Sequence, residues 1–147
     1  MGNSNGNIGI MDLFNQLRQL GLNDLAVLFL NDLWEIIQEL DDIQDEGTCD
    51  CRNLTERIFV SMLQNPWFQA NIQILAPVLT TQVYKWFAAN NLEAEKKSLE
   101  KAYMLRAGYY DVVMYVASLH GRIENPEIIV ELYGETYEEY SKEIKNA

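Results

Sequence analysis

The residue that most invites a chemical role is Arg106, a lone guanidinium in a long apolar stretch. On a helix, its neighbours at three and four positions would be Ala102, Tyr103, Tyr109 and Tyr110. None of these is acidic, and an uncompensated buried charge costs several kcal/mol. If Arg106 is buried, we therefore expect a carboxylate from another helix to hold it. The candidate partners are Glu35, Asp32 and Glu39.

Two interpretations of Arg106 are open. In the functional one, the planar guanidinium clamps an anion or phosphate in a ligand site or a small enzyme. The candidate binding residues are then Arg106, Tyr110, Asp111 and Glu35. In the structural one, Arg106 forms a buried ion pair that tyrosine hydroxyls assist. No glycine loop and no second cation accompanies Arg106, which favours the structural interpretation.

Other site chemistries are poorly supported. Cys49, Cys51 and His120 offer three metal ligands, whereas structural zinc needs four and wider spacing between paired cysteines. The acidic cluster that begins at Asp41 lacks the ligand and glycine spacing of a calcium loop. His120 is the single histidine, and no serine or cysteine lies in a glycine-rich elbow. We predict no catalytic residue, no metal and no cofactor.

The charge of the chain bears on its partners. The net charge is -11, and residues 1–57 carry 11 acidic against 3 basic side chains. Such a chain repels phosphate backbones and anionic lipids, so direct binding to nucleic acid or a membrane is disfavoured. The acidic first third also suggests an alternative function, an inhibitor that occupies the nucleic-acid-binding site of a host protein.

Residues 58–84 form a stretch of 27 residues without any charge. It is long enough to cross a bilayer. Six amide side chains and two prolines make insertion costly, because their polar groups would lack partners in lipid. We therefore expect a buried helical hairpin or a subunit interface here.

The pattern of apolar residues predicts an all-α fold. A chain of 147 residues is one domain by length, and we expect a single compact bundle of six or seven helices. The predicted helices cover residues 8–20, 24–46, 54–64, 66–89, 91–121, 126–133 and a last helix from Thr136. Residues 1–7 are small and polar, and we expect them to be mobile.

The helix at 91–121 is predicted to be the centre of the bundle. Apolar residues recur along it at steps of three and four in two stripes, which is typical of a helix that is covered on most sides. Within it, Gly108 is a poor helix former and is expected to mark a close helix crossing near Trp67 or Trp86. Pro77 is expected to kink or break the preceding helix.

The C-terminal segment, residues 135–147, carries an aromatic stripe that continues from the residues just before it. Its members recur at four, three and four positions and are Tyr133, Tyr137, Tyr140 and Ile144. Such a stripe either docks on the body of its own chain or forms an interface with a partner or a second copy. We favour docking on the chain itself or a homo-oligomer.

Four short segments resemble small all-helical proteins of tailed phages and prophages. They are Asn65–Phe68, Leu75–Pro77, Trp86–Asn90 and Ala102–Ala107. The resemblance covers the middle of the chain and implies a viral or mobile-element setting. It transfers no catalytic residues.

Together these patterns predict a non-enzymatic interaction protein that contacts a protein partner or itself, as a phage accessory or virion component. Cys49 and Cys51 are one residue apart, so a disulfide between them would be strained. The N-terminus lacks the basic and apolar regions of a signal peptide. We therefore expect a cytoplasmic location, in a host cell or a virion.

Overall fold

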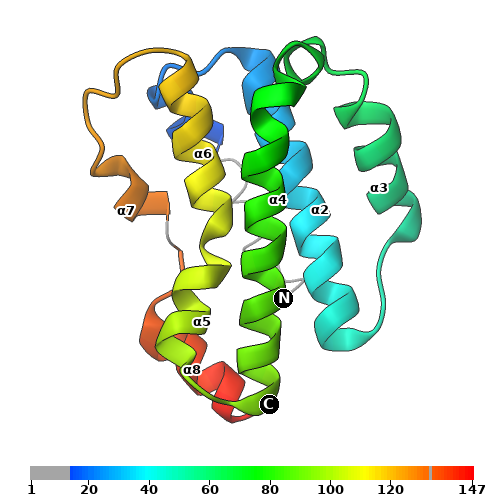
Figure 1. Cartoon of the computed structure of the whole chain (residues 1–147), viewed down its shortest axis with the longest axis vertical. Helices are drawn as coiled ribbons and strands as arrows, with labels where there is room; N and C mark the ends of the chain where they lie inside the picture. Colours follow the sequence, from blue (N-terminus) through cyan, green and yellow to red (C-terminus); the bar gives the residue numbers. More distant parts are fainter. Residues whose placement is uncertain (1–13, 133) are drawn as a thin grey trace. The chain divides into compact units, whose positions relative to one another are not determined.

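The computed structural model of the chain describes residues 14–132 and 134–147. All regular structure in these residues is helical, and they contain no strand, which confirms the all-α class (Figure 1). The helices are α2 (Asp24–Glu46), α3 (Cys51–Glu56), η1 (Arg57–Met62), α4 (Pro66–Glu95), α5 (Leu99–Arg106), α6 (Gly108–Leu119), α7 (Ile128–Leu132) and α8 (Tyr137–Lys145). Residues 14–19 are helical as well. The expectations for residues 1–7 and for Tyr133 lie outside the described residues.

The described residues fall into two compact units. One extends to Ile72, and the other begins at Gln73. The boundary between them lies inside helix α4 and not in a linker. That the 147 residues act as one domain stays a prediction.

Helix α2 spans the predicted residues, 24–46, because both of its ends are capped. The side chain of Asn23 accepts a hydrogen bond from the backbone of Ala26 at 2.8 Å, which satisfies a free amide of the first turn. Gly47 closes the helix in the left-handed conformation (φ 72°), where its N–H bonds the carbonyl oxygen of Ile43.

The core of the first unit is built on the buried ring of Phe29 in α2. This ring stacks on Phe68 with centroids 5.3 Å apart and meets Trp67 at 5.6 Å. The first turn of α4 carries both of these partners, and Asn65 fixes that turn. Its side-chain oxygen accepts from the backbone of Trp67 and Phe68, while its amide donates to the carbonyl of Leu25 at 2.8 Å.

The third predicted helix begins earlier than expected and changes type. Helix α3 starts at Cys51 because Asp50 caps it, accepting from the backbone of Asn53 at 3.0 Å. After Glu56 the chain continues as the π-helix η1, which has wider turns than an α-helix. Runs of π-helix are rare and are often found at functional sites.

Helix α4 is longer than predicted and passes through Pro77 without a break. The predicted break at Pro77 is therefore wrong, whereas the predicted kink stays a prediction. Proline removes one backbone hydrogen bond from a helix, but Pro77 is exposed, and the helix retains 30 residues of continuous structure. The predicted separator at residues 90 and 91 is also helical.

The predicted central helix at 91–120 is not one helix but the end of α4 followed by α5 and α6. The chain turns at Lys96 and Ser98, which both adopt left-handed backbone conformations (φ 53° and 47°). These conformations cannot continue an α-helix. A second interruption at Ala107 (φ -75°, ψ 11°) separates α5 from α6.

Gly108 does mark a close helix contact, as predicted, and the nearest atoms there belong to Gln82. A Cβ atom at position 108 would lie 2.0 Å from Oε1 of Gln82, on helix α4. No side chain larger than hydrogen fits there without a shift of Gln82. The amide of Gln82 is thus pressed against the start of α6.

The turn after α4 also holds the last helix. The ammonium group of Lys96 donates to the carbonyl oxygens of Lys145 at 3.4 Å and Ala147 at 2.9 Å. Helix α8 begins with a capping box, in which Thr136 and Glu139 bond each other's backbone N–H groups at 3.2 and 3.1 Å.

Candidate functional site

The guanidinium of Arg106 is held by residues of α4, the helix that precedes its own. Both Nε and an amino group of Arg106 donate to the carboxylate of Glu93, and the same amino group reaches Oδ1 of Asn90. The exposed fractions of the two charged side chains are 19% for Arg106 and 11% for Glu93. Arg106 thus forms a mostly buried, bidentate ion pair.

Tyr140 of α8 completes this network, because its hydroxyl donates to Glu93 at 2.5 Å. Burial and the hydrogen bond to Glu93 raise the pKa of Tyr140 above its ordinary value, so the hydroxyl keeps its proton. Three helices, α4, α5 and α8, are therefore joined around one carboxylate. We call Asn90, Glu93, Arg106 and Tyr140 the Arg106 network.

The predicted partners of Arg106 are wrong. Asp32 and Glu39 are engaged elsewhere, within the first unit, and Glu35 lies on α2 of that unit. The interpretation of Arg106 as a structural pair, with a tyrosine hydroxyl assisting, agrees with this geometry. The donors of Arg106 are directed at Glu93 and Asn90 in place of an external anion.

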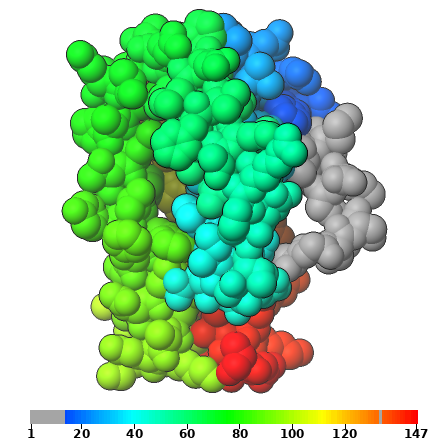
Figure 2. Space-filling view, turned by 90° about the vertical axis from the view of Figure 1, so that its right-hand side faces the viewer, coloured from blue at the N-terminus to red at the C-terminus, as the bar shows by residue number. Residues whose placement is uncertain are grey.

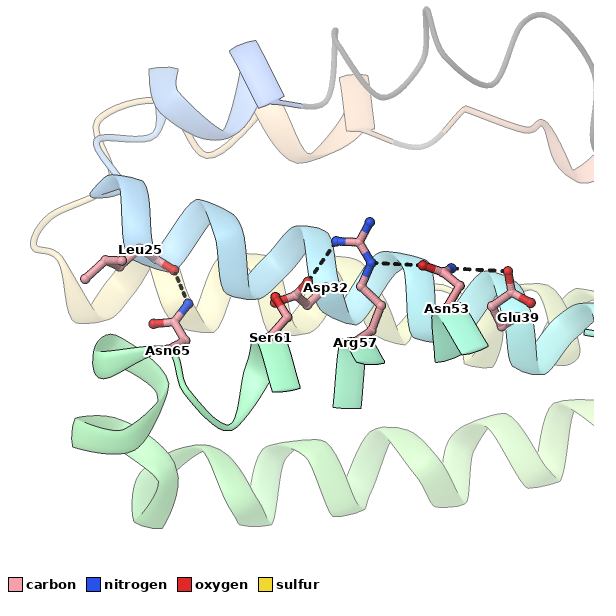
Figure 3. A network of polar contacts seen from close by, with 7 residues as sticks. All are labelled: Leu25, Asp32, Glu39, Asn53, Arg57, Ser61 and Asn65. Carbon is pink, nitrogen blue, oxygen red and sulfur yellow. Dashed lines mark hydrogen bonds and ion pairs between the residues drawn. The ribbon is translucent and has the colours of Figure 1, made fainter. Parts of the chain in front are cut away.

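A second polar network surrounds Asp32 in α2. Asp32 is only 2% exposed. Its carboxylate accepts from Arg57 at 3.0 Å and from the hydroxyl of Ser61 at 2.7 Å, and both donors lie on η1 (Figure 3). The π-helix thus presents two donors, four residues apart, to one buried carboxylate. We call Asp32, Arg57 and Ser61 the Asp32 network.

The Asp32 network extends along α2 and α3. Nε of Arg57 donates to Asn53 at 3.3 Å, and the amide of Asn53 reaches Glu39 at 3.4 Å (Figure 3). Glu39 also accepts from the backbone of Asp50 at 2.7 Å. The chain of contacts fixes α3 and η1 against α2.

Sequence reasoning did not identify Asp32 as a buried residue, although a signal was present. Asp32 follows Phe29 by three residues and precedes Ile36 by four, so it falls on the same helical face as these two apolar residues. Both of them are buried. A lone carboxylate on an apolar face requires a basic partner, and Arg57 supplies it.

The other predicted binding residues do not converge on Arg106. Asp111 is exposed and pairs with Lys85 at 3.2 Å. Tyr110 is partly buried and meets the ring of Tyr109 at 5.6 Å. Burial raises the pKa of Tyr109 above its ordinary value. Of these contacts, the pair of Lys85 and Asp111 joins α4 to α6 within the second unit.

Cys49 and Cys51 are free thiols whose sulfur atoms lie 2.6 Å apart. Their mutual hydrogen bond raises the pKa of the Cys49 thiol to about 11. A thiol with such a pKa is protonated at neutral pH and is a weak nucleophile.

Among the described residues, no group of three metal-ligating side chains is found. His120 caps α6, with Nδ1 at 2.9 Å from the carbonyl oxygen of Val116.

Part of the predicted aromatic stripe packs inside the second unit. Tyr140 is buried, and Tyr137 and Ile144 pack partly buried around Leu99 and Ala102. Tyr103 of α5 meets the rings of Tyr137 and Tyr140 with centroids 5.7 and 5.4 Å apart. These three residues therefore dock on the chain itself, which is one of the two expected alternatives.

The charge-free stretch is helical but leaves many large apolar side chains exposed. On η1 and the residue after it these are Phe59, Val60 and Leu63, which we call the η1 apolar surface. On α4 the exposed residues Ile72, Ala76, Thr80, Val83 and Phe87 recur at four, four, three and four positions. We call these five the α4 stripe; side chains of α4 reach the surface in the view of Figure 2.

The expectation of a buried hairpin is therefore wrong for these residues. The large apolar side chains among them are exposed, and a subunit interface stays a prediction. None of the helices in residues 14–132 and 134–147 combines the length and apolar character that crossing a membrane requires.

Comparison of the chain with models of protein families, with curated proteins and with solved structures finds no match. The resemblance to small proteins of tailed phages therefore stays a prediction from the sequence alone.

Proposed function

We propose that this chain is a non-enzymatic helical protein that binds other protein chains through the η1 apolar surface and the α4 stripe. The observation that carries the proposal is the exposure of large apolar side chains within a stretch that has no charge. Phe59 is 64% exposed, Val83 48% and Tyr84 68%. Contiguous exposed apolar surface on a folded protein commonly marks a contact with another protein.

The proposal fits the composition of protein interfaces. Their centres are poor in charge and rich in aromatic residues, and the polar residues lie at the rim. Residues 58–84 have no charge, whereas acidic residues dominate most of the remaining chain. A partner that covers these residues would remove apolar area from water at about 25 cal/mol per Å².

The two alternative functions receive less support. A ligand site at Arg106 would need guanidinium donors directed at an incoming anion, and Glu93 and Asn90 accept from them. An inhibitor that mimics nucleic acid would need surface carboxylates without contacts inside the chain, and three of the eleven acidic residues in 1–57 do not meet this need. Asp32 and Glu39 are engaged within the first unit, and Asp50 caps α3.

The setting that we propose is that of a tailed phage, in the host cytoplasm or the virion. It rests on the resemblance of the middle of the chain to small phage proteins. The mode of action does not depend on this setting.

The test is recovery of complexes from the native host with the full chain and matched variants. One variant carries Phe59→Ser and Leu63→Ser, and a second carries Val83→Ser and Phe87→Ser. The control carries Met104→Ser and Val130→Ser, whose side chains are 73% and 70% exposed but lie outside the charge-free stretch. Circular dichroism verifies that each variant is folded.

We expect the control to retain the wild-type complexes, including those with a second copy, and at least one surface variant to lose them. Recovery of the same complexes with every variant would overturn the proposal. Recovery of no complex with the wild-type chain, whether with another protein or with itself, would overturn it as well.

A further inference from the structure

The two cysteines of the chain lie together in the loop between α2 and α3. Both thiols are free; Cys49 is partly buried and Cys51 is exposed. Their sulfur atoms are 2.6 Å apart, whereas a disulfide bond joins two sulfur atoms at roughly 2.0 Å. A small movement of the sulfur atoms therefore brings the two thiols to bonding distance.

The residue between the cysteines is held from both sides, which keeps the two thiols adjacent. The backbone N–H of Asp50 donates to Glu39 on α2 at 2.7 Å. The side chain of Asp50 accepts from the backbone N–H of Asn53 at 3.0 Å and caps α3. Glu39 also accepts from the side-chain amide of Asn53 at 3.4 Å (Figure 3). Positioning of this kind raises the effective concentration of one reacting group at the other.

We propose that Cys49 and Cys51 form a reversible redox site, in which exchange with a small organic disulfide oxidises the two thiols to an intramolecular disulfide. A ring closed over one intervening residue is strained, and strained or exposed disulfides are the labile ones that act as switches. The strain that opposes a permanent disulfide thus favours a reversible one. Neither cysteine belongs to the η1 apolar surface or the α4 stripe, so this site goes beyond the proposed function.

The two thiols have different roles in the exchange. The hydrogen bond with Cys51 is the main cause that raises the pKa of the Cys49 thiol to about 11. Cys49 therefore keeps its proton and donates it toward the sulfur of Cys51. Cys51 is also the more exposed of the two. Because a thiolate is the attacking species in such exchange, the first attack comes from Cys51.

The exchange balances in two steps. The Cys51 thiolate bonds to one sulfur atom of the small disulfide RSSR, whose S–S bond breaks and releases RS⁻. This mixed disulfide removes the hydrogen bond that held the proton on Cys49. Cys49 then loses its proton, and its sulfur attacks the sulfur of Cys51, which releases the second RS⁻. The two cysteine thiols thus give up two electrons and two protons, and RSSR becomes two RSH; excess RSH reverses both steps.

The charge around the pair selects the class of disulfide. The carboxylates of Glu39 and Asp50 both contribute to the raised pKa of Cys49 through their negative charge. The basic residue that follows Cys51, Arg52, is engaged by Glu56 at 2.9 Å. Carboxylates attract a cationic disulfide and repel an anionic one. We therefore expect the site to prefer disulfides that carry amino groups.

The test is oxidation of the reduced full chain by cationic cystamine, neutral hydroxyethyl disulfide and anionic oxidised glutathione. Alkylation of free thiols and mass spectrometry follow the reaction, and each rate is divided by that of the same reagent with a neutral cysteine derivative. We expect the wild-type chain to lose both thiols without retaining an RS group, and to regain both in excess RSH. The normalised rates should fall from cystamine to oxidised glutathione, and added salt should reduce the difference.

Matched variants separate the roles of the residues, and circular dichroism verifies that each is folded. Cys49→Ser and Cys51→Ser should both stop at the mixed disulfide, and Cys49→Ser, which retains the exposed thiol, should form it faster. Asp50→Ala loses the cap of α3 and should lower the equilibrium constant of ring closure by about fivefold. Asp50→Asn removes the same charge but can still cap α3, so it should lower this constant less.

The proposal would be overturned by a wild-type chain that keeps both thiols in these reagents, that retains an RS group on each thiol, or that forms only disulfides between chains. A slower reaction of Cys49→Ser than of Cys51→Ser would overturn the assignment of Cys51 as the attacking thiol. Equal normalised rates for the three reagents would overturn the preference for cationic disulfides. Equal closure constants for Asp50→Ala and Asp50→Asn would overturn the positioning role of the cap.

Discussion

The Arg106 and Asp32 networks stabilise a buried charge in different ways. In the Arg106 network, both charges are mostly removed from water, and a neutral amide and a hydroxyl assist them. In the Asp32 network, only the carboxylate is buried, and the side chain of Arg57 remains 32% exposed. The first network therefore depends on every member, whereas in the second the arginine retains access to water.

This difference predicts how much stability is lost in each unit when one partner or the other is removed. Removal of one partner from a buried pair leaves a charge that water cannot reach, and that cost exceeds the net contribution of the intact pair. In the second unit the cost should be large whichever partner is removed. In the first unit it should depend on which partner is removed.

The largest effect is expected for Glu93→Gln. This change leaves the mostly buried guanidinium of Arg106 without its carboxylate, at a cost of about 3–5 kcal/mol in the free energy of unfolding. Urea unfolding, combined with hydrogen exchange of the amides in α5 and α8, measures it. The double variant Glu93→Gln with Arg106→Met should recover more than half of the loss, and a double variant as unstable as the single one would contradict the interpretation.

A smaller and asymmetric effect is expected in the Asp32 network. Arg57→Met leaves the buried carboxylate with Ser61 and should cost about 2–4 kcal/mol, since a buried charge loses its main partner. Asp32→Asn leaves Arg57 free to turn toward water and should cost about 1–2 kcal/mol. Amide exchange in α2 and η1 compares the two variants, and equal costs would remove the proposed distinction between the networks.

The second unit should also respond to pH through Glu135. Burial, followed by a hydrogen bond with Glu143, raises the pKa of Glu135 from 4.5 to about 7. The folded chain then binds more protons than the unfolded chain between these values, so stability falls as the pH rises from 4.5 through 7. The free energy of unfolding should be lower at pH 8 than at pH 5, and Glu135→Gln should reduce this difference. An unchanged difference in the variant would show that other groups cause the pH dependence.

The smallest effect is expected for the exposed pair of Lys85 and Asp111, whose side chains are 37% and 50% exposed. Asp111→Asn should change the free energy of unfolding by less than about 1 kcal/mol, because solvent screens such pairs. Thermal unfolding in low and high salt measures it. A loss as large as that of Glu93→Gln would show that exposure does not separate these ion pairs.

Local signals in the sequence predicted much of the fold. Asn23 and Gly47 bound α2 at the predicted residues 24–46, Asn65 caps α4, and Thr136 with Glu139 forms the capping box of α8. Each of these signals acts within a few residues, so it can be recognised without knowledge of tertiary contacts.

The partner of Arg106 was missed because of a wrong helix boundary. In one continuous helix, Glu93 and Arg106 would be about 20 Å apart, since 13 residues separate them at roughly 1.5 Å each. The turn at Lys96 and Ser98 reverses the chain and brings them together. Neither residue is glycine or asparagine, the usual markers of a left-handed turn, so composition gave no warning.

That turn ties two requirements to a single side chain. Lys96 occupies a backbone conformation that glycine would adopt at less cost, by roughly 1 kcal/mol. A glycine at position 96, however, would lack the ammonium group that donates to the backbone oxygens of Lys145 and Ala147 at the end of α8. A substitution at position 96 therefore cannot relieve the backbone strain and also keep the last helix anchored. A glycine substitution meant to stabilise the protein is better placed at Ser98.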